Sequence, residues 1–181
     1  MFGKIFSSLF GRKSPIPQQL YGSVVAQWRN PVFFTDFSFE DTVTGRFDLL
    51  TLHVFLLSRR LVREDDALST SLNQEIFDLY TQDIDIALRN LGVGDPSVPK
   101  RKKKMVRGFY AIVEEFAHAM DDENEKELAK AIKDRFYKDV KKSPHVKLSK
   151  YIIKAAAKLD AQPSSEIYKG ELAWQDPADF V

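Results

Sequence analysis

The side chains that could do acid–base or metal chemistry in this sequence are three histidines and one pair of closely spaced aspartates. His53, His118 and His145 lie far apart along the chain, and none has a carboxylate at the spacing of a metal-binding motif. Asp83 and Asp85 are two positions apart, which on a helix turns their side chains about 200° away from each other. The common phosphate-binding, nucleophile and zinc motifs are missing as well. We therefore expect a protein that is not an enzyme and has no catalytic residues, metal or cofactor.

His53 has a second interpretation because of its surroundings. It lies in the most apolar stretch of the chain, residues 47–57, in which eight of eleven side chains are apolar. A histidine in such a stretch is typically a core residue whose ring nitrogens are hydrogen-bonded inside the protein. We predict this structural role for His53, with a functional role as the alternative.

The most pronounced charge feature is a basic cluster near the middle of the chain. It consists of Lys100, Arg101, Lys102, Lys103, Lys104 and Arg107. The cluster falls in the first turns of an expected helix, where each exposed cation opposes the helix dipole by about 0.3–1 kcal/mol. Because helix stability does not explain these cations, we predict an anionic partner: RNA, phospholipid headgroups or an acidic protein surface. An ordinary solvated face is the alternative.

A second basic feature lies closer to the C-terminal end. The basic stripe Lys147, Lys150, Lys154 and Lys158 has spacings of three and four residues, so its members share one side of an expected helix. The simpler interpretation is a core helix with lysines along its solvent edge. The functional interpretation joins the stripe and the basic cluster into one electropositive surface. Neither has the exposed aromatic or arginine–glycine motifs of base-specific recognition, and a DNA partner is not expected.

The first thirteen residues have the pattern of a short amphipathic helix. Its apolar face would consist of Phe2, Ile5, Phe6, Leu9 and Phe10. Arg12 and Lys13 follow this face directly. An aromatic face with a basic flank suits the headgroup region of a membrane, so these residues are candidates for contact with a membrane surface. The alternative is an ordinary first helix packed on the domain.

The overall composition is that of a folded protein in a reducing compartment. The chain has 181 residues, 44% of them hydrophobic and 29% charged, and no cysteine. The formal net charge of +1 hides an uneven distribution: residues 1–99 contain 9 basic and 12 acidic side chains, whereas residues 100–181 contain 18 and 14. We find neither a signal peptide nor a membrane-spanning run. A cytoplasmic location at the membrane periphery is expected.

The elements that would position these side chains are all helices, because apolar residues recur at steps of three and four. The predicted helices cover residues 18–29, 44–63, 68–91, 95–120, 123–141 and 146–160, the fourth of them capped by Asp95. Residues 32–42 are expected to form an ordered, aromatic-rich loop. We predict an all-α fold, a single compact bundle of about seven helices. Its domain would cover residues 16–161, between an amphipathic segment at 1–13 and an irregular tail at 162–181.

Three blocks of sequence point to a known family. They are YGSVVAQWRNPVFF at 21–34, DTVTGRFDLLTLHVFLL at 41–57, and DIDIALRNLGVGDPSVPKRKKKM at 83–105, which is followed by GFY at 108–110. In order and spacing these blocks resemble the ubiquinol–cytochrome c chaperone family, whose mitochondrial members assist the assembly of cytochrome b into respiratory complex III. The length and the lack of a transit peptide resemble a bacterial member.

The resemblance implies an assembly chaperone whose client is newly made cytochrome b, working near the ribosome and the inner membrane. A hydrophobic client needs an apolar surface, and the aromatic loop is our candidate for its wall. The client-binding candidates are Phe33, Phe34, Phe37, Phe39, Asp41, Arg46 and His53. Arg46 is also expected to pair with Asp41 at the start of the central helix. The alternative function is an adaptor module that binds ribosome, RNA or a lipid surface.

Overall fold

The computed structural model describes residues 15–122 and 124–181, and in these residues it contains helices and no strand. The α-helices are α1 (Ile16–Trp28), α2 (Val32–Thr35), α3 (Val43–Val62), α4 (Ala67–Asn90), α5 (Val98–Asp121), α6 (Glu125–Phe136), α7 (His145–Ala161) and α8 (Ser164–Ile167). Two 3-10 turns, η2 (Asp95–Ser97) and η3 (Pro177–Phe180), complete the fold. The prediction of an all-α bundle is confirmed. The amphipathic segment predicted at 1–13 lies outside the described residues.

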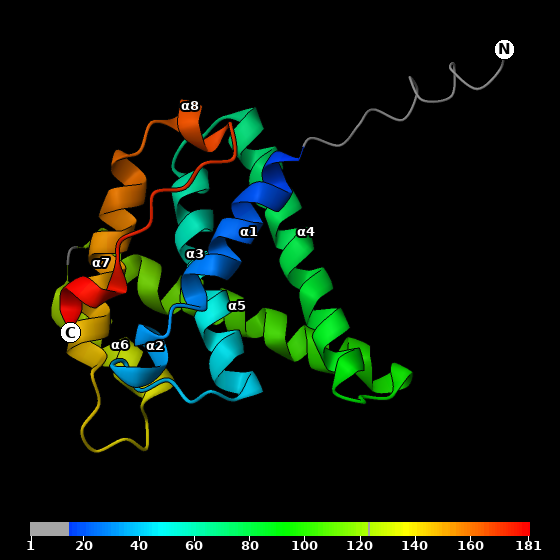
Figure 1. The fold of residues 1–181 in the computed structure, drawn as a ribbon, viewed down its shortest axis with the longest axis vertical. Helices are drawn as coiled ribbons and strands as arrows, with labels where there is room; N and C mark the ends of the chain where they lie inside the picture. The colour runs from blue at the N-terminus through cyan, green and yellow to red at the C-terminus, as the bar shows by residue number, and fades with distance from the viewer. Residues whose placement is uncertain (1–14, 123) are drawn as a thin grey trace, which may run out of the picture.

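Helix α3 is the centre of the bundle, with α1, α4, α5 and α7 packed around it (Figure 1). Its middle is buried on nearly all sides, as expected for the most apolar stretch of the sequence. The helix begins where the hydroxyl of Thr42 accepts a hydrogen bond from the backbone N–H of Gly45 at 3.2 Å. No helix in the described part of the chain has the length and hydropathy needed to cross a membrane.

Helices α4 and α5 meet at a turn at the lower right of Figure 1 and diverge from it, α4 upward along the right side and α5 leftward behind α3. The chain turns between them at Gly92, whose φ of 74° is easily adopted only by glycine. The predicted cap of α5 was wrong: Asp95 lies in the preceding 3-10 turn, and α5 begins at Val98. The carboxylate of Asp95 pairs with Arg89 of α4 instead of capping α5, so it pins the turn to the helix before it.

The helix predicted over 123–141 is shorter in the structure, where α6 ends at Phe136. The reason is Tyr137, which leaves the helical path and turns into the core with only 1% of its surface exposed. Its hydroxyl donates a hydrogen bond to the carbonyl of Phe37 at 2.6 Å. The buried hydrogen bond ties the aromatic loop to the end of α6.

The C-terminal tail is docked rather than loose. It runs from α8 past the upper part of α3 and down along α7 (Figure 1). The indole N–H of Trp174 donates to the hydroxyl of Ser23 at 3.1 Å, and the amide of Gln27 donates to the carbonyl of Gln175 at 2.9 Å. Both partners are on α1, so the tail fastens the first helix to the last elements of the chain.

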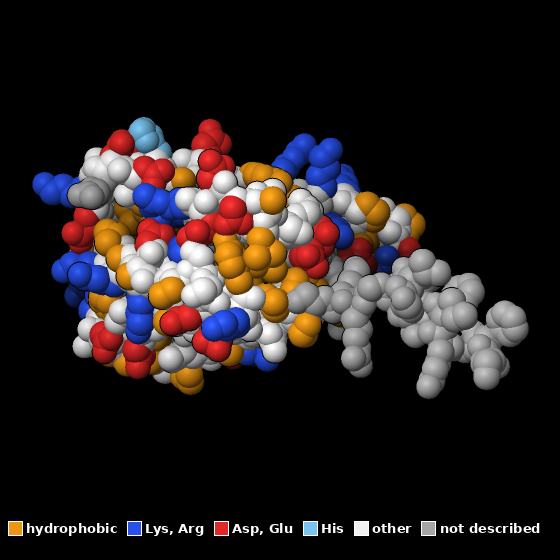
Figure 2. Space-filling view, turned by 90° about the horizontal axis from the view of Figure 1, so that it is seen from above, with side chains coloured by type: hydrophobic (Ala, Val, Ile, Leu, Met, Phe, Trp, Pro, Cys, Tyr) orange, Lys and Arg blue, Asp and Glu red, His pale blue; other side chains and the backbone are white. Residues whose placement is uncertain are grey.

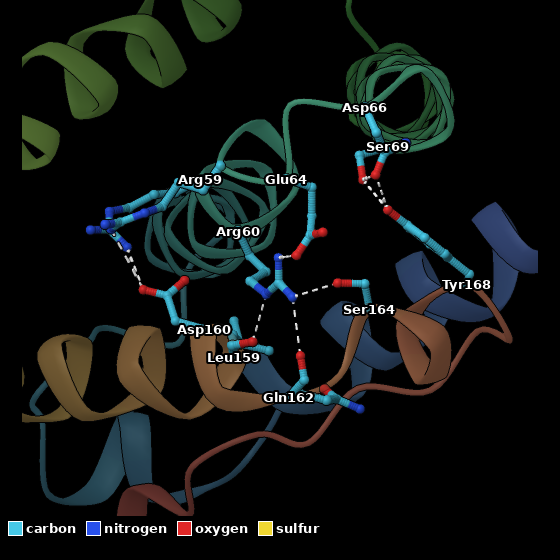
Figure 3. A network of polar contacts seen from close by, with 11 residues as sticks. Arg59, Arg60, Glu64, Asp66, Ser69, Leu159, Asp160, Gln162, Ser164 and Tyr168 are labelled. Carbon is cyan, nitrogen blue, oxygen red and sulfur yellow. Dashed lines mark hydrogen bonds and ion pairs between the residues drawn. The ribbon is translucent and has the colours of Figure 1, made fainter.

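A buried arginine organises the other end of this tail (Figure 3). Arg60 of α3 is only 5% exposed and donates hydrogen bonds to the carbonyls of Leu159 (2.8 Å) and Gln162 (3.0 Å). It also donates to the hydroxyl of Ser164 at 3.1 Å and pairs with Glu64. Arg60 therefore supplies hydrogen bonds to carbonyls that are left without helical partners where α7 ends. The positive charge of Arg60 is compensated by Glu64 in the same network.

Candidate client-binding surface

The aromatic loop does not form an exposed wall. Phe33 and Phe37 are fully buried and Phe39 is 6% exposed, so these three rings belong to the core. Phe33 packs edge-on against the ring of Tyr151 with centroids 5.2 Å apart. Only Phe34 keeps part of its surface accessible. In this structure the loop is therefore pinned by its rings, as predicted, and three of them have no surface available to a client.

His53 is a hydrogen-bonded core histidine, which confirms the structural interpretation of this residue. Its Nδ1 lies 2.7 Å from the carbonyl of Leu49, which can only accept, so Nδ1 carries the proton. Its Nε2 then accepts from the hydroxyl of Tyr151 at 2.8 Å. Burial lowers the pKa of the His53 imidazole to about 4, so the ring is neutral at pH 7. Both ring nitrogens are occupied, and neither is available as a ligand.

Asp41 and Arg46 form the ion pair expected at the start of the central helix. The Nε of Arg46 donates to the carboxylate of Asp41 at 2.6 Å, and both side chains are more than half exposed. The hydrogen bond from Arg46 lowers the pKa of the Asp41 carboxyl, against the effect of burial. Together with Phe34 the pair lines an open basin of about 480 Å³ at the end of α1.

An apolar groove of about 300 Å³ adjoins this basin and shares Trp28 and Arg46 with it. It lies between the end of α1, the first turns of α3, the last turns of α4 and the start of α5. Its apolar lining consists of Trp28, Val43, Phe47, Leu50, Ile84, Ile86, Ala87 and Met105. Val43 and Ile86 are 49% and 48% exposed. We call it the Trp28–Met105 groove; it is the surface that the sequence did not reveal.

Trp28 has an unusual position at the junction of groove and basin. The residue is only 9% exposed, yet its buried indole N–H has no hydrogen-bond acceptor in the described part of the chain. An unsatisfied buried donor costs about 1–3 kcal/mol. The guanidinium of Arg29 lies over the ring, 5.3 Å from its centroid. The junction of groove and basin therefore combines the ring of Trp28, its indole N–H without an acceptor, and the cation of Arg29 over the ring.

The basic cluster lies on the first turns of α5, as predicted, and all its members except the half-buried Lys102 are exposed. Among the described residues no acidic side chain forms an ion pair with any of the six cations. On the face shown in Figure 2, acidic and basic side chains are mixed around a central hydrophobic patch, and a group of Lys and Arg side chains stands apart at the upper right. The cluster is a true excess of positive charge, not one half of a salt-bridge network.

The basic stripe and the basic cluster do not form one surface. The stripe lies on α7, whose core-facing side is buried through residues such as Tyr151 and Leu159. Figure 1 places α7 and the start of α5 at opposite sides of the molecule. The stripe is therefore the solvent edge of a core helix, which is the simpler of its two interpretations.

A polar cleft of about 1200 Å³ lies beside α5 and α6. Asp48 of α3 lies in its wall and has no hydrogen-bond partner among the described residues. Burial raises the pKa of its carboxyl to about 6, although the nearby charge of Arg135 opposes this. In the described part of the chain no group of acidic or histidine side chains is arranged to hold a metal ion.

Comparison with known proteins identifies the chain's relatives. The sequence model of the ubiquinol–cytochrome C chaperone family matches residues 35–174. The chain belongs to this family. As a family member it is a chaperone of the ubiquinol–cytochrome c reductase system, which confirms the resemblance read from the three sequence blocks.

A solved structure agrees with this assignment. The chain is similar to the crystal structure of the Cbp3 homolog from Brucella abortus, with 32% sequence identity and a TM-score of 0.85. The match covers 96% of this chain and 98% of that one. No match was found among curated protein sequences. The family match extends to residue 174, beyond the sequence blocks, which end at residue 110.

Proposed function

We propose that this chaperone binds newly made cytochrome b and assists its incorporation into the ubiquinol–cytochrome c reductase complex. The observation that carries the proposal is the family match over residues 35–174. Two surfaces of the structure support it: an open apolar groove and a basic cluster that forms no ion pair in the described part of the chain. We further propose that the protein acts by binding alone, without catalysis, at the cytoplasmic side of the inner membrane.

A deletion strain tests this proposal. Cells without the gene should contain less cytochrome b in reduced-minus-oxidised spectra and less assembled complex III, and the full-length gene supplied in trans should restore both. Other membrane complexes should stay at normal levels, which separates a specific chaperone from a general defect. Normal cytochrome b and normal complex III in the deletion strain would refute the proposal.

A second candidate function, a ribosome- or RNA-binding adaptor, is favoured by the basic cluster alone. Binding through unpaired cations weakens steeply as the salt concentration rises. We expect the protein to co-sediment with ribosomes at low salt, and replacement of Lys100, Lys103 and Lys104 by Glu to abolish this. The matched control replaces Lys147, Lys150 and Lys154 of the basic stripe. Loss of co-sedimentation in both triple variants would argue against a specific role of the cluster.

The lipid-surface form of this alternative has a different test. If the predicted amphipathic segment binds anionic bilayers, liposomes that contain anionic lipid should float with the full-length protein, and Phe6→Asp should reduce the floated fraction. Unchanged flotation would count against a membrane role for the segment. Cell fractionation would then show whether the protein still collects at the inner membrane.

A further inference from the structure

The Trp28–Met105 groove exposes apolar side chains that ordinary packing does not require. Val43 and Ile86 lie on facing helices, α3 and α4, and half of each side chain is open to solvent. Phe47, Ile84 and Met105 also line the groove. An apolar concavity between helices can receive the apolar face of another helix, with side chains at every third and fourth position filling it.

The two acidic side chains beside the groove each accept a hydrogen bond from a neighbouring side chain. Asp83 accepts a hydrogen bond from the hydroxyl of Tyr21 at 2.8 Å. Asp85 accepts one from Arg89 at 2.7 Å, and this bond, together with the charge of Lys102, keeps the pKa of the Asp85 carboxyl below its ordinary value. Asp85 is thus compensated by the charge of Arg89, whereas the partner of Asp83 is the uncharged hydroxyl of Tyr21.

The cations at the two ends of the groove are, by contrast, unpaired. At one end Arg101 and Lys102 precede Met105 by four and three residues, so they share its side of α5. At the other end Arg29 lies over Trp28 and has no ion-pair partner in the described part of the chain. Both ends of this apolar groove therefore carry positive charge, although the charge of Lys102 also acts on Asp85.

We propose that the groove receives an apolar helix of the client with carboxylate side chains near its ends. The apolar face would cover Val43 and Ile86, and the carboxylates would meet Arg29 at one end and Lys102 at the other. A bilayer surface also combines apolar and anionic groups, but it does not enter a hollow between helices, so the concave shape favours a protein helix. This inference rests on the proposed function, because it assigns the place where the client binds.

Site-specific photocrosslinking tests the assignment in the full-length chain. A photoreactive amino acid is placed at Ile86 in the groove, or at Val146, which is 46% exposed on α7 and lines no part of the groove. Cytochrome b is then synthesised with a radiolabel in a cell-free system that contains the protein. We expect a strong adduct from position 86 and at least a tenfold weaker one from position 146. Equal adducts from both positions would overturn the assignment.

Substitutions test the two parts of the recognition separately. Ile86→Glu should reduce the co-purified cytochrome b at least tenfold, whereas Val146→Glu should leave it unchanged. Lys102→Glu should reduce it about threefold and Lys154→Glu should not, since exposed charge pairs contribute little individually. A Lys102→Glu protein that binds as well as the wild type would refute the carboxylate part, and an Ile86→Glu protein that does so would refute the groove.

The outcomes also separate this inference from the proposed function. If the wild type captures cytochrome b but position 86 gives no adduct, the groove assignment fails and the proposed function stands. If the wild type captures none and the deletion strain assembles complex III normally, the proposed function fails and the assignment fails with it. If Ile86→Glu reduces liposome flotation and leaves client capture intact, the groove is a membrane contact and the proposal is overturned.

Discussion

Replacement of His53 by Asn should change the pH dependence of stability in a way that can be calculated from the structure. The imidazole is fully buried, and burial lowers its pKa from 6.5 to about 4. In the unfolded chain the same ring titrates near its ordinary value. Between pH 6.5 and pH 4 the unfolded state therefore binds more protons than the folded state, so wild-type stability falls as the pH falls.

The magnitude follows from the difference between the two pKa values. At about 1.4 kcal/mol per pKa unit, a depression of about 2.5 units corresponds to about 3 kcal/mol. This part of the stability of the wild type is fully present above pH 6.5, decreases as the pH falls, and is lost at about pH 4. His53→Asn also removes ring contacts and the hydrogen bond from Tyr151, which should destabilise the protein by about 2–4 kcal/mol at pH 7.5. As the pH falls to 4, this deficit should shrink by about 3 kcal/mol.

Urea unfolding followed by circular dichroism, at several values between pH 4 and pH 7.5, measures this deficit directly. Leu52→Ala is the matched control, because Leu52 is a fully buried residue of the same helix that does not titrate. Its deficit should be independent of pH. Asp48 titrates in the same range, but it is present in all three proteins and cancels in the differences. A His53→Asn deficit that stays constant with pH would refute the assignment of a neutral, buried imidazole.

Three further stability measurements probe other parts of the fold. Asp48→Asn should stabilise the protein by up to about 3 kcal/mol above pH 6, because burial disfavours the ionised carboxyl and raises its pKa to about 6. Equal urea midpoints for the variant and the wild type at pH 7.5 would contradict this. Arg60→Leu should lower the free energy of unfolding, measured in urea, by about 3–5 kcal/mol, because it leaves buried carbonyls unpaired. Arg63→Leu, at a half-exposed side chain, should lower it by under about 1 kcal/mol. Similar losses of stability in the two variants would argue against the network around Arg60. Gly45→Ala should lower the melting temperature, because the added Cβ would lie 2.1 Å from a backbone carbonyl oxygen. Gly22→Ala, in open space on α1, should raise it. The reversed order would show that the backbone does not approach Gly45 this closely.

Much of the fold could be predicted from the sequence because its helices have regular apolar patterns. The central helix and the α4–α5 pair were recognised from apolar spacing and from glycine at the turn. The end of α6 could not be recognised, because Tyr137 leaves the helix for a hydrogen bond to Phe37, one hundred residues earlier in the chain. A local pattern contains no information about such a partner.

The candidate site was harder to predict for a similar reason. Aromatic residues in a loop suggest a binding surface, yet Phe33 and Phe37 fill the space between α2 and α7 in the core. The groove, in contrast, is made by residues from four helices, such as Trp28, Ile86 and Met105, each of which looks like an ordinary member of its own helix. Only the packing of the helices shows that these side chains surround a hollow. The charges of the basic cluster were visible in the sequence, but their lack of counter-ions was not.

The most direct test of the central claim is a pulse–chase measurement of the client on the chaperone. Cells that produce the tagged full-length protein are labelled briefly, and the protein is purified at increasing times of chase. We predict that labelled cytochrome b is bound at the earliest times and leaves the chaperone as it appears in complex III. The account would be contradicted if no labelled cytochrome b were bound at any time while complex III assembled at its normal rate.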